Sequence, residues 1–393
     1  MRTLVINTYG GSLLLGATAV GAEIIGSYED SGFGMGIQKA NFPHLNFIAQ
    51  QKDWPTQDLS ETVVIAHPPC SAFSVQNSSK LASVKGIDSN AFKCTREVLQ
   101  YAMRNRAVAI AVESVMGALG GAWTVHQAFA DENGYNLYRI LQNGAMFGAQ
   151  WRERFWAVFV RKGAAPDAFM WTLHPNFKRV QDVIAGHEDG PSTGNLDRLL
   201  ADLKHRLRHE SGLDDDQLSY LFDVQDPHFE TGGIQKIFRN KFFPQEDMWK
   251  VCMLHLGTFT SGLMCYVNPL GLCPTILGGS WFYINGRNMS EKAYKVLMGF
   301  PVDYDFPEEP RKYRSQMRMY LSKGVIPQVA SWVLENIYTH LGDKSFTPTT
   351  KSGHTPYHLM VGPNQIADFR FKKKHWEDAL ANNVIPIRNE EDI

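Results

Sequence analysis

The stretch VVIAHPPCSAFS, residues 63–74, carries most of the information about how the chain folds. Its first four residues are apolar, which is typical of a strand buried on both faces of a parallel sheet. Pro68 and Pro69 end that strand and place the thiol of Cys70 at its carboxyl end. Ligands bind at this edge of open α/β sheets. A single cysteine is more commonly a small buried apolar residue, so both interpretations of Cys70 remain open here.

Other apolar runs of the same kind alternate with helical patterns. Strands are expected at residues 4–6, 22–29, 63–66, 108–112 and 155–160, and helices at residues 13–20, 95–104, 290–298 and 329–340. This alternation predicts an α/β fold with a doubly wound, parallel sheet. Between about 165 and 285, Pro, Gly, His and basic residues interrupt every pattern, which indicates a smaller, loop-rich region.

The composition excludes several classes of protein. The chain has 393 residues with 44% apolar and 20% charged residues, so it can form a full core and is not disordered throughout. Its 39 Lys and Arg nearly balance 40 Asp and Glu, so a polyanion must be bound by a local basic surface. No signal-peptide pattern or membrane-length apolar run is present. Five cysteines without a regular framework predict free thiols and a cytoplasmic protein.

A second expected strand ends at Glu113, which therefore also projects from the carboxyl edge of the sheet and can meet Cys70. A carboxyl group in a partly apolar cleft can have a raised pKa and donate a proton. The alternative is an acid that caps the next helix or faces solvent.

Residues 150–154 read QWRER, and strand alternation places Gln150, Arg152 and Arg154 on one face. Two guanidinium groups on one face suit a phosphate backbone or an acid that must be held in place. The alternative is a strand with one exposed, charged face.

In this order, the segments resemble the DNA cytosine-C5 methyltransferase family. Its Pro-Cys motif is similar to residues 69–74, its Glu-Asn-Val motif to residues 113–115 with Ser114 in place of Asn, and its Gln-x-Arg-x-Arg motif to residues 150–154. Later in the chain, Arg287 resembles the arginine that begins a late helix of the family. Residues 297–301 resemble the Leu-x-Gly-Phe-Pro motif that ends this helix. Residues 322–329 resemble the closing motif Gly-Asn-Ala-Val-Pro-Pro-x-Val.

The resemblance implies a Rossmann-like, doubly wound mixed sheet with a smaller loop-rich target recognition domain. The catalytic domain would comprise residues 1–165 and 312–342, the target recognition domain residues 166–311, and a C-terminal extension residues 343–393. The implied protein is a monomer that binds double-stranded DNA and has no membrane segment. No metal is expected, because Cys252, His255, Cys265 and Cys273 match no zinc spacing.

The resemblance also implies a mechanism in which the cytosine is flipped out of the duplex. Cys70 would attack C6, Glu113 would protonate or hydrogen-bond N3, and Arg152 would hold the ring or the acid, with Arg154 as a further catalytic residue. The residues expected to contact DNA are Ser74, Gln76, Gln150, Arg239 and Thr275.

The implied donor is S-adenosylmethionine. The residues expected to bind it are Tyr9, Gly10, Gly11, Glu29, Asp53, Pro68 and Lys323. Tyr9 and the two glycines stand in the family's Gly-rich first loop, where Tyr9 takes the place of a stacking Phe. Glu29 ends the second strand and is placed to meet ribose hydroxyls.

Lys323 departs most sharply from the family, which has Asn beside the reactive carbon of the donor. An ammonium there repels a sulfonium but would pair with the carboxylate of carboxy-S-adenosylmethionine, which predicts a 5-carboxymethylcytosine product. Alternatively, Lys323 points toward a DNA phosphate or a carboxylate such as Glu335, and the protein transfers a methyl group. A third hypothesis is an inactive DNA-binding relative, which would be expected to lose the nucleophile first.

Overall fold

The computed structural model describes most of the 393-residue chain. The described residues are 1–29, 32–49, 51–74, 85–187, 205, 208–209, 214–215, 264–267, 270–273, 275–276, 281–284, 287–307, 313–343, 356–371 and 375–382.

Helices and strands alternate through the first half of the chain, as predicted. The strands are β1 (Arg2–Ile6), β2 (Glu23–Tyr28), β3 (Phe47–Ile48), β4 (Thr62–Ala66), β5 (Ala109–Ser114), β6 (Tyr135–Asn143), β7 (Glu153–Arg161), β8 (Phe169–Leu173), β9 (Met264–Tyr266), β10 (Trp281–Ile284), β11 (Arg287–Asn288), β12 (Tyr357–Val361) and β13 (Ile366–Asp368). The α-helices are α1 (Ser12–Ala19), α2 (Gly32–Asn41), α3 (Asn90–Arg104), α4 (Ala118–Gly121), α5 (Trp123–Asn133), α6 (Val180–Ile184), α11 (Glu291–Leu297), α12 (Tyr313–Lys323), α13 (Pro327–His340) and α14 (Trp376–Asn382).

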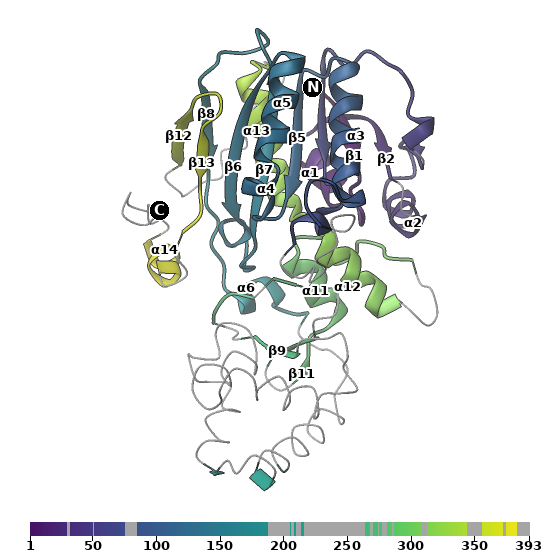
Figure 1. The fold of residues 1–393 in the computed structure, drawn as a ribbon. Coiled ribbons are helices and arrows are strands. Elements are labelled where there is room, and N and C mark those ends of the chain that lie inside the picture. Colours follow the sequence, from purple (N-terminus) through teal and green to yellow (C-terminus); the bar gives the residue numbers. More distant parts are fainter. Residues whose placement is uncertain are drawn as a thin grey trace.

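One eight-stranded sheet organises the fold, with the order β13-β6-β7-β5-β4-β1-β2-β3 (Figure 1). Strands β1 to β5 are parallel, β13 is parallel to β6, and β7 is antiparallel to both β5 and β6. The predicted α/β, doubly wound mixed sheet is therefore confirmed. The chain winds outward from β1 in one direction and from β4 in the other, so the switch point lies between these two strands.

The apolar run in β4 is buried on both faces because each face carries a helical layer. Val63 and Ile65 belong to the apolar cluster that includes residues of α1 and α13, whereas Val64 belongs to the cluster that includes residues of α3. All three side chains are fully buried. This explains why β4 is continuously apolar rather than alternating.

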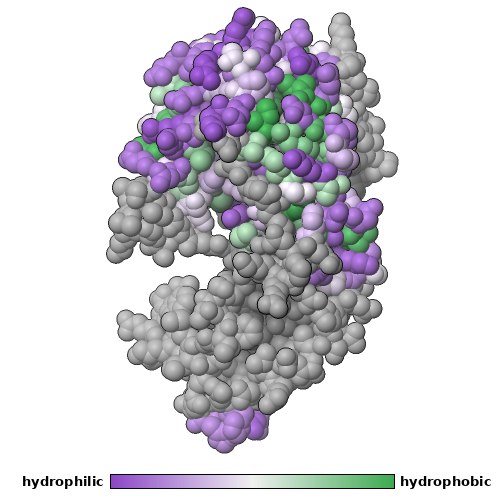
Figure 2. Space-filling model, turned by 90° about the vertical axis from the view of Figure 1, so that its right-hand side faces the viewer, coloured by the Kyte–Doolittle hydropathy of each residue, from purple (hydrophilic) through white to green (hydrophobic). Residues whose placement is uncertain are grey.

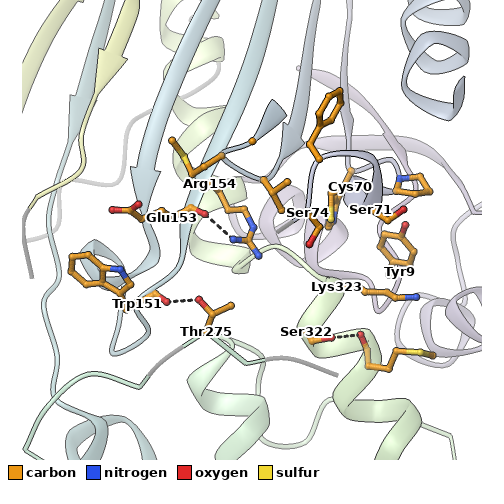
Figure 3. Close-up of a pocket in the computed structure, with 17 residues that line it drawn as sticks. Tyr9, Cys70, Ser71, Ser74, Trp151, Glu153, Arg154, Thr275, Ser322 and Lys323 are labelled. Carbon is orange, nitrogen blue, oxygen red and sulfur yellow. Dashed lines mark hydrogen bonds between the residues drawn. The ribbon is translucent and has the colours of Figure 1, made fainter. Parts of the chain in front are cut away.

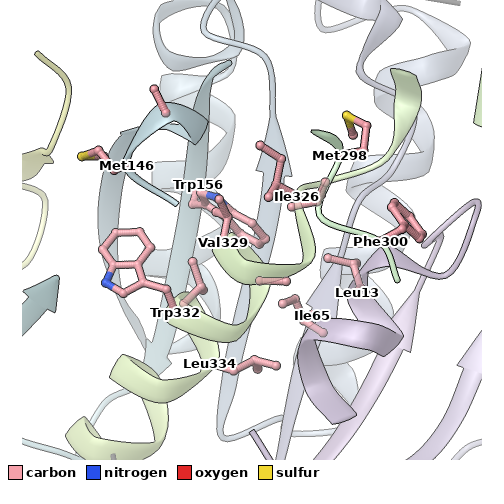
Figure 4. Packing of buried hydrophobic residues seen from close by; sticks show 14 of the residues in the cluster. Leu13, Ile65, Met146, Trp156, Met298, Phe300, Ile326, Val329, Trp332 and Leu334 are labelled. Atoms are coloured by element: carbon pink, nitrogen blue, oxygen red, sulfur yellow. The ribbon is translucent and has the colours of Figure 1, made fainter. Parts of the chain in front are cut away.

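Helix α13 brings the late part of the chain back onto the first helix. A Cβ atom at Gly16 of α1 would lie only 2.6 Å from Cβ of Ala330 and 2.8 Å from the carbonyl oxygen of Pro327. Gly16 therefore permits the close approach of the two helices. Val329 and Trp332 of α13 complete the core beside Trp156 of β7 (Figure 4).

The last strands extend the fold at one edge. β13 pairs with β6 in the main sheet, and β12 pairs antiparallel with β8. The C-terminal segment predicted as an extension therefore includes the edge strand of the main sheet. At the carboxyl end of the parallel strands lie α6, α11 and α12, with the small sheet β11-β10-β9 beyond them (Figure 1).

Polar side chains cover most of the described part of the surface in Figure 2, with apolar ones gathered in a few places. In the part of the chain that the structure describes, no helix combines the length and apolar character that a membrane span requires.

Candidate active site

A cavity of about 780 Å³ opens at the carboxyl edge of the sheet, beside the switch point between β1 and β4. Residues from distant parts of the chain line it, including Tyr9 after β1, Cys70 after β4, Arg154 in β7, Thr275, and Lys323 at the end of α12. Figure 3 shows Trp151 and Glu153 on one side of the cavity, and Cys70, Tyr9 and Lys323 on the other. The volume suits a small-molecule or cofactor site.

Cys70 begins a 3-10 turn, Cys70–Ala72, directly after the Pro-Pro pair. Burial raises the pKa of its thiol, the nearby Glu113 carboxylate raises it further, and Arg154 and Arg152 oppose this effect. The thiol is therefore mostly protonated at neutral pH. Nucleophilic attack by Cys70 must be coupled to removal of the thiol proton.

Glu113 lies beneath the cavity and is fully buried. Its Oε2 atom is 3.0 Å from Nε2 of His67, and its Oε1 atom is 3.1 Å from Nε of Arg154. His67 and Arg154 both line the cavity, whereas Glu113 does not. His67 and Arg154 therefore lie between the Glu113 carboxylate and the cavity.

The two arginines contact different groups. Arg152 was expected to hold the ring or the acid, and the guanidinium beside Glu113 in the structure is that of Arg154. Arg152 donates instead to the carbonyl oxygens of Ser322, at 2.8 Å, and Gly324, at 2.7 Å. Burial and the neighbouring Arg154 lower the pKa of Arg152 to about 9, so it remains charged at neutral pH.

The loop between β1 and α1 is held in an unusual backbone conformation. Tyr9 has φ of 52°, in the left-handed region that non-glycine residues seldom adopt. Its amide donates to Oε2 of Glu29 at 2.7 Å, and its carbonyl oxygen accepts from Nε2 of Gln38 at 3.0 Å. These contacts stabilise the strained loop next to the cavity, where such strain is commonly functional.

The neighbouring glycines pack against a late segment of the chain. Gly11 has φ of 89°, and a Cβ atom there would overlap the hydroxyl of Tyr304. That hydroxyl donates to the carbonyl oxygen of Gly10 at 2.8 Å. The turn therefore requires glycine for both its conformation and its packing.

Lys323 is exposed and lines the cavity, with its Nζ atom 5.9 Å from the ring centroid of Tyr9. Within the described residues it forms no ion pair, so the structure does not show the expected alternative contact with Glu335. Its ammonium group adds positive charge to the wall of the cavity that Tyr9 also forms.

Of the residues predicted to contact DNA, some line the cavity and one is buried inside the protein. Ser74 and Thr275 line the cavity, and Thr275 donates to the carbonyl oxygen of Trp151 at 2.7 Å. Gln150, predicted to contact DNA, is fully buried, and its Nε2 atom lies 3.1 Å from the sulfur of Met298. The side chain of Gln150 therefore joins two segments of the protein and does not reach a DNA surface in this structure.

Five predicted donor residues do not line the cavity: Gly10, Gly11, Glu29, Asp53 and Pro68. Pro68 is buried beside it, and Asp53 is exposed at the end of the 3-10 turn Gln51–Asp53. Glu29 is buried and contacts the Tyr9 loop instead. Gln76 and Arg239 lie outside the described residues.

His67 is the site residue that the sequence analysis missed. It is buried, contacts Glu113, and stands edge-on to the ring of Tyr9 with a centroid separation of 5.3 Å. The signal was present, because a polar histidine directly after four apolar strand residues is unexpected in a buried strand end.

No group of three or more His, Cys, Asp or Glu side chains in the described ranges is arranged to hold a metal ion.

Comparisons with known proteins agree with this architecture. Among solved structures, one described as a DNA modification methyltransferase encoded within an E. coli prophage has a TM-score of 0.55 and 15% identity, covering 87% of this chain and 100% of the other. A mutant of Spodoptera frugiperda DNMT2 has a TM-score of 0.53 and 14% identity, covering 86% and 99%. The Entamoeba histolytica methyltransferase EhMeth has a TM-score of 0.54 and 11% identity, covering 87% and 98%. At these identities the likeness shows the fold alone.

A search of curated proteins found no significant match. The sequence profile of C-5 cytosine-specific DNA methylases, however, matches residues 2–339, which is most of the chain and includes the cavity with its cysteine. The chain belongs to the C-5 cytosine-specific DNA methylase family.

Proposed function

We propose that this protein modifies C5 of a cytosine flipped out of double-stranded DNA, with Cys70 as a covalent nucleophile. The observation that carries the proposal is that Cys70 and Arg154 line one cavity above the buried Glu113. The cavity lies at the edge of the sheet where α/β proteins bind ligands. An intact nucleophile and acid argue against an inactive relative.

In the first step, the Sγ–H bond of Cys70 breaks, an Sγ–C6 bond forms, and the Glu113 carboxylate takes up the thiol proton. N3 of the cytosine gains a proton or a hydrogen bond through Glu113, so addition needs no external acid. Arg154 stabilises the Glu113 carboxylate from the cavity side. After transfer to C5, the C5 proton passes to solvent water, the Sγ–C6 bond breaks, and the proton held at N3 returns by way of Glu113 to the thiolate, which restores Cys70.

An adenosyl sulfonium donor fits the site. The wall formed by Tyr9, Pro69 and Lys323 is continuous with the cavity that contains Cys70, and the strained backbone of Tyr9 is stabilised by the buried Glu29 carboxylate. S-adenosylmethionine, when bound, supplies an electrophilic one-carbon group. Tyr9, Gly10, Gly11 and Lys323 would hold the donor on this side of the cavity.

DNA would approach from the side of Ser74 and Thr275, which line the cavity. We assign target recognition to residues 166–311, which include Arg239, and Gln76 is a further expected contact. Extrusion of the base costs a few kcal/mol, and contacts in the cavity must offset this cost.

A covalent trapping experiment tests the proposal. Incubation with DNA that contains 5-fluorocytosine should give an adduct stable in SDS, because fluorine at C5 prevents release of Cys70. Cys70→Ser should form no adduct while still binding DNA, and Cys94→Ser, which alters a thiol in α3 away from the cavity, should behave as wild type. Failure of the wild-type protein to form an adduct with any donor would exclude covalent catalysis by Cys70.

A second candidate is transfer of a carboxymethyl group from carboxy-S-adenosylmethionine. The observation that favours it is the cavity-lining ammonium of Lys323, which lacks a carboxylate partner among the described residues. Two cations in one site repel, whereas a carboxylate on the donor would pair with Lys323. The two donors are distinguished by mass spectrometry of the modified nucleosides.

A further inference from the structure

His67 lies between the donor side of the cavity and the buried acid. Its ring packs edge-on against Tyr9 at 5.3 Å between centroids, and its Nε2 atom is 3.0 Å from Oε2 of Glu113. The other carboxylate oxygen, Oε1, faces Nε of Arg154 at 3.1 Å. Each oxygen of Glu113 therefore lies close to one basic group, and neither oxygen accepts a well-aligned hydrogen bond from the residues that the structure describes.

The surroundings keep the imidazole neutral. Burial lowers the pKa of His67 to about 4, and the positive charges of Arg152, Arg154 and Lys323 act in the same direction, while Glu113 alone opposes them. Nδ1 has no hydrogen-bond partner among the described residues. Next to a carboxylate, the single ring proton is favoured on Nε2, which lies 3.0 Å from Oε2 of Glu113.

We propose that His67 is a positioning residue for Glu113. As a neutral donor, His67 orients the acid, and packing against Tyr9 holds the ring of His67 in place. This inference rests on the proposed C5 transfer. A neutral donor fixes the carboxylate without adding a second full charge beside Arg154. Proton transfer to N3 depends on the direction of the carboxylate, so loss of His67 would slow the chemical step more than it weakens binding.

The test compares two polar variants in steady-state transfer to a cytosine-containing duplex. His67→Gln can place an amide N–H near the position of Nε2, whereas the shorter His67→Asn reaches only the position of Nδ1. We expect His67→Asn to lower kcat about ten- to a hundredfold with KM for DNA and donor changed less than threefold. His67→Gln should recover most of that loss, which a merely structural role does not predict.

A double-mutant cycle with Glu113→Gln tests whether His67 acts through the acid. If it does, His67→Asn should have little further effect in the Glu113→Gln background. His340→Leu is the matched control, because His340 is a partly buried histidine, with a pKa lowered by burial to about 4, that stacks on Phe169 away from the cavity. It should leave kcat unchanged.

Equal rates for wild type and His67→Asn, or additive losses in the double mutant, would overturn the inference. Equal losses of activity in His67→Gln and His67→Asn would also overturn the inference. Cys70→Ser in the same assay distinguishes failure of the proposed function from failure of the role of His67. If Cys70→Ser still transfers the group, covalent catalysis by Cys70 is wrong.

Discussion

Arg152 donates a hydrogen bond of 2.7 Å to the carbonyl oxygen of Gly324, which lies 172 residues further along the chain. The same guanidinium nitrogen donates to the carbonyl oxygen of Ser322, so both residues that flank Lys323 are held through their carbonyl groups. The ammonium of Lys323 is therefore placed in the cavity wall by a buried cation that never reaches the cavity itself. Substitution of residue 323 therefore changes the side chain that this backbone presents to the cavity.

Replacement of Lys323 by Asn should shift the product toward 5-methylcytosine. A charge-assisted contact between Lys323 and a carboxylated donor is typically worth about 1.5–3 kcal/mol, or roughly ten- to a hundredfold in donor preference. Nucleoside mass spectrometry with both donors in competition measures this ratio. Lys323→Arg, which keeps the charge, should retain the preference, and an identical ratio for wild type and Lys323→Asn would mean that Lys323 does not contact the donor.

The rate of covalent addition should rise with pH. Burial and Glu113 raise the pKa of the Cys70 thiol, so the thiolate fraction increases by up to about tenfold per pH unit through the neutral and mildly alkaline range. Adduct formation with 5-fluorocytosine DNA between pH 6.5 and 9 measures the dependence. Peptide-level alkylation of Cys70 by iodoacetamide provides a check without DNA. A rate that is flat above pH 7 would contradict the raised pKa.

Glu113→Gln should lose most activity and still fold. The amide keeps the shape of the side chain but cannot deliver a proton to N3. It also weakens the contacts with His67 and Arg154, which favour a carboxylate. Turnover by Glu113→Gln and its melting temperature separate these effects. Near wild-type turnover at an unchanged melting temperature would show that Glu113 has only a structural role.

Gly11→Ala should destabilise the protein far more than Gly21→Ala. Both positions have positive φ, 89° and 69°, which costs an alanine roughly 1 kcal/mol. At Gly11 the new methyl group would also overlap the Tyr304 hydroxyl, whereas nothing lies within 4 Å at Gly21. We expect an additional loss of about 1–3 kcal/mol at Gly11, measured by denaturant unfolding. Equal losses would show that the loop relaxes away from Tyr304.

His126→Phe should reduce the sensitivity of the fold to acid. Burial lowers the pKa of His126 from 6.5 to about 3, so below pH 6.5 the unfolded chain binds a proton that the folded protein does not. The resulting stability is present above pH 6.5 and falls by about 1.4 kcal/mol per pH unit as the pH decreases toward 3. Phenylalanine does not titrate and suits the aromatic neighbours Phe155 and Phe159.

Melting temperatures between pH 4.5 and 8 check this prediction. As the pH falls, the melting temperature of His126→Phe should decrease less than that of wild type. Parallel plots of melting temperature against pH for the two proteins would contradict the prediction. His67 and His340 titrate in the same direction and contribute equally to both curves.

The sequence was sufficient for five of the eight strands of the main sheet and for the place of the nucleophile. Four apolar residues before a Pro-Pro pair can only be a short buried strand that stops, and Cys70 follows it at the carboxyl edge. Local pattern also placed Glu113 at the end of β5. Strands β3, β6 and β13 were missed: β6 is fully buried although it contains Arg139 and Asn143, and β3 and β13 have only two and three residues.

Only the tertiary structure decided which side chains meet. Strand alternation put Gln150, Arg152 and Arg154 on one face, but β7 begins at Glu153, so the alternation does not extend to the two earlier residues. Because β7 runs antiparallel to β5 with Ser114 opposite Phe155, Arg154 lies next to Glu113, while Arg152 turns to the carbonyl groups around Lys323. Register and packing between distant segments set these contacts, and the period of a single segment carries no information about them.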